Sequence, residues 1–166
     1  MLNFWDFSAW GAVNLFAVLL ISLLAANLLK YPWARPRMYF LAEEAAAEFV
    51  PWYRPGSTQR AEFMAQGAAA DAFRSFPSGH VTTAAVSLLW LLFPSMHRFF
   101  EGKGCLLFGL SVVWTAVVSV SRLTMGAHFL SDAALSWLMV LLLFALFLPL
   151  VYGEGPFYRF LKRLLS

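Results

Sequence analysis

Apolar residues gather in four long runs along the chain, each separated from the next by a polar segment. The runs cover about residues 8–29, 81–96, 105–121 and 133–152. A helix needs roughly 20 apolar residues to cross a bilayer. The second and third runs are shorter, which is tolerated where polar helix ends line a cavity instead of meeting lipid. The pattern therefore predicts an all-α, polytopic transmembrane helix bundle with four spans.

The first run is as apolar as the core of a signal peptide, but its context differs. Asp6 stands where a signal peptide carries basic residues, and the run is longer than a typical signal core. We therefore predict that it persists in the protein as a membrane helix.

Residues 38–75, between the first two runs, have a different composition and predict an interfacial segment. Residues 39–50 and 57–73 are rich in Ala and Glu or Gln, which favour helix. The Pro- and Gly-containing stretch PWYRPG, residues 51–56, separates them. We expect two short helices that lie at the membrane surface.

Composition supports one integral-membrane domain over residues 1–166. The chain is 61% hydrophobic and 13% charged, whereas about 25% of residues are charged in a typical soluble domain. A net charge of +3 without a long basic run argues against a nucleic-acid partner, and we predict none. The lone Cys105 excludes an intrachain disulfide and a cysteine-based metal cluster. We expect the bilayer and a lipid substrate as partners, and no obligate protein partner; the oligomeric state stays open.

Basic residues near the ends of the runs predict the orientation. With four spans, both termini and the loop at 97–104 share one side of the membrane. That side carries Arg98, Lys103, Arg159, Lys162 and Arg163, and the basic side is usually cytoplasmic. On the other side, acidic residues nearly balance the basic ones. We therefore expect cytoplasmic termini, and a segment 38–75 that faces the periplasm or cell exterior.

Three polar clusters interrupt the apolar pattern, and all three fall on this outward side. They are KYPWARPRM at 30–38, SFPSGH at 75–80 and SRLTMGAHFLSD at 121–132. Topology alone should gather their ionisable residues at one end of the bundle. Ionisable groups at membrane helix ends are costly and usually functional, so we interpret this set as a site.

The residue types in the clusters point to a phosphate ligand. Arginine offers forked donors that match phosphoryl oxygens, and lysine adds a point charge. Pro77, Ser78 and Gly79 lead into a predicted helix, whose first free backbone N–H groups favour anions. A carboxylate four residues from an imidazole, as in His128 and Asp132, would lie one helical turn away and fix its tautomer. His80 could then act as the general acid, since an imidazole titrates near neutrality.

The three clusters resemble the signature of the type 2 phosphatidic acid phosphatase superfamily, which reads K-x6-R-P, P-S-G-H and S-R-x5-H-x3-D. The second motif is present as residues 77–80 and the third as residues 121–132. The first is present as Lys30 and Arg37, but Met38 stands where the family has proline. A second register, Arg35-Pro36, keeps the dipeptide but shortens the spacing from six residues to four. The chain is similar to the family's smaller bacterial members, which implies an inner-membrane location.

The resemblance implies a role for each motif residue. His128 would be the nucleophile that forms a phosphohistidine, Asp132 would orient it, and His80 would protonate the leaving group and then activate water. The phosphoryl oxygens would be held by Lys30, Arg37, Ser78, Gly79 and Arg122, with Arg35 as the alternative arginine. Neither a metal nor another cofactor is implied, because fixed cations would stabilise the charge.

The expected function is therefore metal-independent hydrolysis of a lipid phosphate monoester or pyrophosphate. Phosphatidylglycerophosphate, undecaprenyl pyrophosphate, lipid A phosphate and phosphatidic acid all fit the motifs. A lipid phosphotransferase of the same superfamily would use the same residues with another lipid as acceptor. A haloperoxidase on the related vanadate scaffold is disfavoured by the apolar spans. A non-catalytic membrane scaffold is the remaining alternative, which Met38 alone favours.

Overall fold

The computed structural model describes residues 4–88 and 98–151, with side chains over 17–88 and 99–146. Within these ranges the chain is helical and forms no strand, which confirms the all-α prediction. The elements in chain order are α1 (Phe4–Trp33), α2 (Met38–Glu43), α3 (Ser57–Ala65), the 3-10 turn η1 (Ala70–Phe73), α4 (Gly79–Ala85), the 3-10 turn η3 (Arg98–Phe100), α6 (Gly104–Thr124) and α7 (Leu130–Val151).

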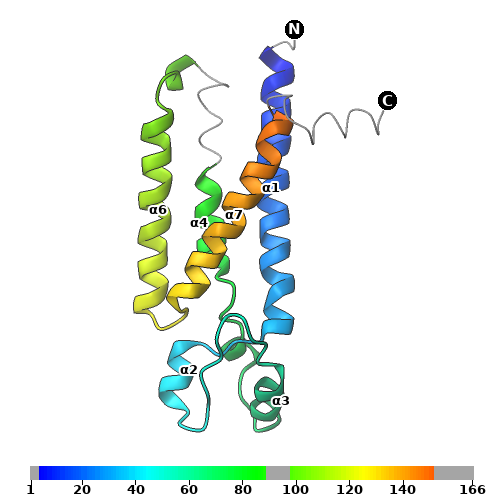
Figure 1. The fold of residues 1–166 in the computed structure, drawn as a ribbon, viewed down its shortest axis with the longest axis vertical. Helices are drawn as coiled ribbons and strands as arrows, with labels where there is room; N and C mark the ends of the chain where they lie inside the picture. The colour runs from blue at the N-terminus through cyan, green and yellow to red at the C-terminus, as the bar shows by residue number, and fades with distance from the viewer. Residues whose placement is uncertain (1–3, 89–97, 152–166) are drawn as a thin grey trace, which may run out of the picture.

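The helices form a bundle with a cap at one end, as Figure 1 shows. We use the name cap for residues 34–78, which include α2, α3 and η1. The short helix α4 contacts α1, α6 and α7 and so occupies the centre of the bundle. Ala85 and Leu88 pack there against Val140 of α7, and all three side chains are buried.

The chain reverses direction at each connection, and this places four helix ends beside the cap. α1 runs toward the cap, α4 leaves it, α6 returns to it and α7 leaves it again (Figure 1). The turn between α6 and α7 is tight because Gly126 adopts a φ of 65°, which L-residues with a Cβ rarely adopt. The carbonyl of Gly126 also accepts a hydrogen bond from Tyr39 N–H at 2.9 Å. The turn is thereby joined to the cap.

Large apolar side chains on the long helices point away from the bundle. Leu28 of α1 is 71% exposed, Val113 of α6 is 60% exposed and Leu142 of α7 is 62% exposed. The segments Ala17–Glu43 and Gly104–Thr124 are long and apolar enough to cross a membrane, and only 22% and 17% of their apolar windows are buried. A core helix of a soluble protein would be mostly buried. These helices therefore point to a membrane protein.

The prediction of four spans is not confirmed: the described residues contain two helices that meet the length and hydropathy criteria for a span. α7 has 22 residues, but its described side chains extend only over Leu130–Leu146, a shorter apolar helix. The predicted span at 81–96 begins in α4, which ends at Ala85, and residues 89–97 lie outside the described residues. The basic tail at 155–166 also lies outside them.

The cap departs from the predicted pair of helices in two respects. The second predicted helix, 57–73, is divided into α3 and η1, with a turn at Gln66–Gly67 between them. The first predicted helix, 39–50, ends at Glu43 instead. Beyond it the chain turns inward, where Val50 is buried and the Phe49 ring packs against Phe129 at 5.1 Å. These tertiary contacts override the local helix propensity of the Ala and Glu residues.

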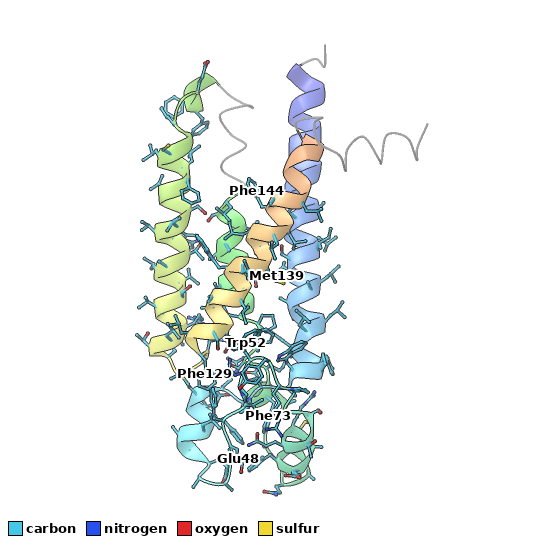
Figure 2. The ribbon with its side chains drawn as sticks, viewed as in Figure 1. Glu48, Trp52, Phe73, Phe129, Met139 and Phe144 are labelled. Carbon is cyan, nitrogen blue, oxygen red and sulfur yellow. The ribbon has the colours of Figure 1, made fainter. Side chains whose placement is uncertain are left out.

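Aromatic side chains form the core of the cap. Phe63 and Phe73 are buried together with Ala72, and Phe40 packs against them. The Phe40 ring lies 5.4 Å from that of Phe63 and 5.0 Å from that of Phe73, both edge to face. Figure 2 places Phe73 in the cap and Phe129 where α7 meets it. The cap is thus a packed unit that can hold its loops in fixed positions against the helix ends.

Candidate active site

The predicted site residues lie at the cap end of the bundle, because the helices alternate in direction (Figure 1). Lys30 is in the last turn of α1 and Arg122 is in the last turn of α6. Gly79 and His80 open α4, and Asp132 is in the first turn of α7. The ends of helices far apart in sequence are therefore neighbours in space.

The first two motifs meet at Gly79. A Cβ on Gly79 would lie 3.6 Å from Lys30 Nζ, and among the described residues no other atom outside its own helix and its chain neighbours comes within 4 Å of it. The amine of Lys30 thus points at the first turn of α4. Since Gly79 has no side chain, an anion could reach both the amine and the backbone of this turn.

Ser78 is the N-cap residue of α4, and its side chain is fully buried. Its hydroxyl accepts a hydrogen bond from Val81 N–H at 3.4 Å, and its own N–H donates to Ser136 Oγ at 2.9 Å. Helix geometry leaves the N–H groups of Gly79 and His80 without intrahelical partners. Ser78 therefore shapes the turn, and the groups that this turn offers to an anion are the N–H groups of the next two residues.

His128 has a fixed orientation. Its Nδ1 lies 2.6 Å from the carbonyl oxygen of Ser75, and a carbonyl oxygen can only accept a hydrogen bond. Nδ1 therefore carries the proton, and the lone pair is on Nε2. The ring is 2% exposed, so its neighbours hold it on nearly all sides.

The relation between His128 and Asp132 differs from the sequence prediction. His128 lies in the loop before α7 and not on the helix. Its Nδ1 is 3.6 Å from Asp132 Oδ2, which exceeds hydrogen-bond distance. Asp132 thus lies near the imidazole as a charge, whereas the carbonyl of Ser75 provides the hydrogen bond that orients the ring.

Asp132 is fully buried and has several donors around it. Its Oδ2 accepts from the hydroxyl of Ser75 and from Phe129 N–H, the latter at 2.9 Å. Its Oδ1 accepts from the guanidinium of Arg35. The bond to Phe129 N–H caps the start of α7, so one carboxylate both begins the helix and holds the segment around His128.

The two arginines of the first cluster have opposite environments. Arg35 is 1% exposed and forms an ion pair with Asp132. Arg37 is 16% exposed and pairs at 3.0 Å with Asp71, whose side chain is 63% exposed. Arg37 Nε also donates to the Asp71 carbonyl at 2.9 Å. Of the two arginines, Arg37 is the one with access to solvent.

Positive charge is concentrated around His80. Loss of solvation lowers the pKa of His80 below its ordinary value of 6.5, and the charges of Arg122, His128, Lys30 and Arg37 lower it further. His80 itself is exposed. These charged residues lie at the end of the bundle where topology predicts them.

The guanidinium of Arg122 makes few hydrogen bonds to the described residues. Its Nε is buried and has no hydrogen-bond partner among the described residues. Its terminal nitrogen contacts Ser121 Oγ at 3.2 Å and Met125 Sδ at 3.0 Å, and a thioether sulfur is a weak acceptor. Its guanidinium is therefore available to an anionic ligand.

Two residues of the site were not identified from the sequence. Ser75 contributes its carbonyl to His128 and its hydroxyl to Asp132. Ser136 joins Ser78 of α4 to Asp132 of α7 through its hydroxyl. Ser75 lies just before the second motif, and Ser136 lies one helical turn after Asp132. This closeness to the motifs is the only indication of the two serines that the sequence offers.

The described residues contain no group of three or more His, Cys, Asp or Glu side chains that could hold a metal ion. A cavity of about 470 Å³ lies in the cap, lined in part by Phe49, Val50 and residues of α3. The predicted catalytic residues do not line this cavity. The ionisable residues of the three polar clusters instead gather where the helix ends meet the cap.

Comparison with known families gives one result. The family model described as the PAP2 superfamily matches residues 11–155, which is most of the chain. Neither the search of curated proteins nor the search of solved structures gave a match.

Proposed function

The chain belongs to the PAP2 superfamily of phosphatases, and we propose that it is a membrane lipid phosphatase that works through a phosphohistidine on His128. Family membership supports a phosphoric ester hydrolase in general. The apolar outward faces of α1, α6 and α7 support a substrate that is itself in a membrane. The observation that carries the proposal is the hydrogen bond from His128 Nδ1 to the Ser75 carbonyl, because it leaves Nε2 free to attack.

In the first step, His128 Nε2 attacks the phosphorus atom, so that a P–N bond forms and the P–O bond to the lipid breaks. The departing alkoxide takes a proton from His80. The Ser75 carbonyl stabilises the positive charge that the imidazole acquires, and the nearby Asp132 carboxylate does so at longer range. The products are a phosphohistidine and a lipid alcohol or a lipid monophosphate.

In the second step, His80 takes a proton from water, and the resulting hydroxide attacks phosphorus. The P–N bond breaks, the electron pair returns to His128 Nε2, and inorganic phosphate leaves. Both steps place negative charge on the equatorial phosphoryl oxygens. Lys30, Arg37, Arg122 and the N–H groups of Gly79 and His80 would stabilise that charge without reorganising.

We further propose that the cap faces the periplasm or cell exterior and that both termini are cytoplasmic, with several spans in an inner membrane. The N-terminal end of α1 and residues 98–104 lie at the end of the bundle opposite the cap (Figure 1). The basic residues Arg98 and Lys103 lie on that side, which the charge bias of membrane proteins makes cytoplasmic.

A panel of purified lipid phosphates tests the reaction. The purified protein in detergent would be given each lipid singly, with a metal chelator present, and inorganic phosphate would be measured. Release from one class supports the proposal and identifies the substrate. Transfer to a second lipid without phosphate release would indicate a phosphotransferase, and complete loss of activity on chelation would contradict the metal-free mechanism.

A further inference from the structure

Two arginines lie two residues apart in the first cluster, but only one of them can reach a ligand. The guanidinium of Arg35 has no free face: Nε donates to the Val50 carbonyl at 2.7 Å. A terminal nitrogen donates to Ser131 Oγ at 2.8 Å and to the carboxylate of Asp132. Three of its five N–H donors are therefore in use, and its side chain is only 1% exposed.

Two aromatic rings flank the same guanidinium. Its central carbon lies 4.2 Å from the centroid of the Phe129 ring and 5.1 Å from that of Phe49. The two rings also contact each other edge to face. The rings fix the plane of the guanidinium and exclude water from its ion pair with Asp132. A buried carboxylate depends on such a partner, because an unpaired buried charge is very costly.

The ion pair is connected to the catalytic imidazole through Ser75. Ser75 N–H donates to the Arg35 carbonyl at 3.1 Å, and its hydroxyl donates to Asp132. The Ser75 carbonyl accepts the Nδ1–H of His128. The backbone of Arg35 therefore holds Ser75 on one side. Asp132, the ion-pair partner of the Arg35 side chain, holds it on the other.

From this closed network we propose that Arg35 is a positioning residue: it holds Asp132 and Ser75 so that the Ser75 carbonyl fixes His128 with Nε2 free. Arg37, not Arg35, is then the arginine that meets the phosphoryl group. This assignment deepens the proposed function and rests on it for any measurement of turnover. The state of the imidazole ring is a separate readout that does not require turnover.

The matched variants are Arg35→Gln and Arg37→Gln, studied in the full chain in detergent. For Arg35→Gln, kcat should fall about 10- to 100-fold, the range seen when a group that orients a functional imidazole is removed. KM and the inhibition constant for inorganic phosphate should stay within about twofold of wild type, because no contact to phosphate is lost. Arg37→Gln should raise both constants instead.

The pH profile separates positioning from a general loss of structure. Asp132 faces Arg35 and His128 directly, and Lys30 acts on it at longer range. Without Arg35 the carboxylate protonates more readily, so the acid limb of kcat should move to higher pH. Arg35→Lys keeps the charge, so it should restore part of kcat and return the acid limb part of the way to its wild-type pH. In Arg37→Gln the limb should stay in place.

Nitrogen-15 NMR of the His128 ring provides the readout that does not depend on activity. The wild-type ring should be protonated at Nδ1, and Arg35→Gln should populate the form protonated at Nε2. If Arg35→Gln does not fold, Ser131→Ala and Phe49→Leu each remove one contact of the guanidinium. They should lower kcat less, again with the phosphate inhibition constant unchanged.

Three results would overturn the assignment. A phosphate inhibition constant that rises tenfold in Arg35→Gln would make Arg35 a phosphate ligand. A kcat and acid limb equal to wild type in that variant would remove its positioning role. If the His128 ring of the wild-type protein is protonated at Nε2, the network does not leave that nitrogen free, and the assignment fails. If no lipid phosphate is hydrolysed but the ring changes tautomer as expected, the proposed function fails and the positioning role stands.

Discussion

The two sides of His128 carry charge in opposite ways. On the Nδ1 side, Arg35, Asp132 and Ser75 are buried and satisfy one another. The other side is formed by α4 and the ends of α1 and α6. There the positive charges of Lys30 and Arg122 act on His80, and the Nε of Arg122 has no hydrogen-bond acceptor among the described residues. Paired charges hold the side chains around His128 in one arrangement, whereas unpaired positive charge favours the binding of an anion. Under the proposed function, the buried side would orient the nucleophile and the cationic side would hold the substrate.

The largest effect should come from His128, where the two sides meet. His128→Asn keeps a polar side chain but removes the nucleophile, and turnover should fall by at least about 10⁴-fold, as when other nucleophiles are removed. Phosphate release from the preferred lipid measures this, with circular dichroism as the check on folding. Activity within tenfold of wild type would mean that another residue attacks phosphorus.

The next test concerns the side that holds the substrate. Asp71 is a surface acceptor that competes for Arg37, so Asp71→Asn should free the guanidinium and lower KM about two- to fivefold, as expected for a surface ion pair worth up to about 1 kcal/mol. Arg37→Ala should raise KM. KM measured at low and high salt checks this, because salt screens the same pair. A higher KM in Asp71→Asn would show that Asp71 assists binding.

The pH dependence of the activity should differ between the free protein and the protein with bound substrate. The cations around His80 lower its pKa, and a bound phosphate group would offset them. His80 must be protonated to act as the acid, so activity is lost as pH rises through its pKa. The basic limb of kcat/KM, which reports the free protein, should therefore lie below pH of about 6.5, and the limb of kcat should lie higher. Coincident limbs, or limbs unchanged in His80→Gln, would argue against this role.

The smallest effect should come from the turn that joins α6 and α7 to the cap. Gly126→Ala places a Cβ on a residue with φ of 65°, which should lower the free energy of unfolding by about 1–2 kcal/mol. Gly109→Ala, in α6, is the matched control: no atom of the described part of the chain outside α6 lies within 4 Å of its Cβ position. This variant should be neutral or slightly stabilising. Thermal unfolding measures both, and equal melting temperatures would show that the turn is not strained by a Cβ.

The sequence predicted at which end of the bundle the cationic residues lie, but it did not predict the contacts that hold Asp132 and Ser75. Alternating apolar runs place Lys30, His80 and Arg122 at one end of the bundle, and the motif spacing identifies them. The partners of Arg35 are Val50, Ser131 and Asp132, which lie 15 to 97 residues away along the chain. No local pattern encodes those contacts. They depend on the path of the cap after Glu43, where packing of Phe49 and Val50 overrides helix propensity.

The central claim is that His128 Nε2 attacks phosphorus, and trapping the intermediate tests it most directly. In His80→Gln, p-nitrophenyl phosphate needs no proton to release its leaving group, but water is no longer activated. A phosphoryl group should therefore accumulate on His128, labile to acid and stable to base, and mass spectrometry should locate it there. The label should be absent from His128→Asn. A label on another residue, or turnover by the wild-type protein with no labelled residue in His80→Gln, would contradict the account.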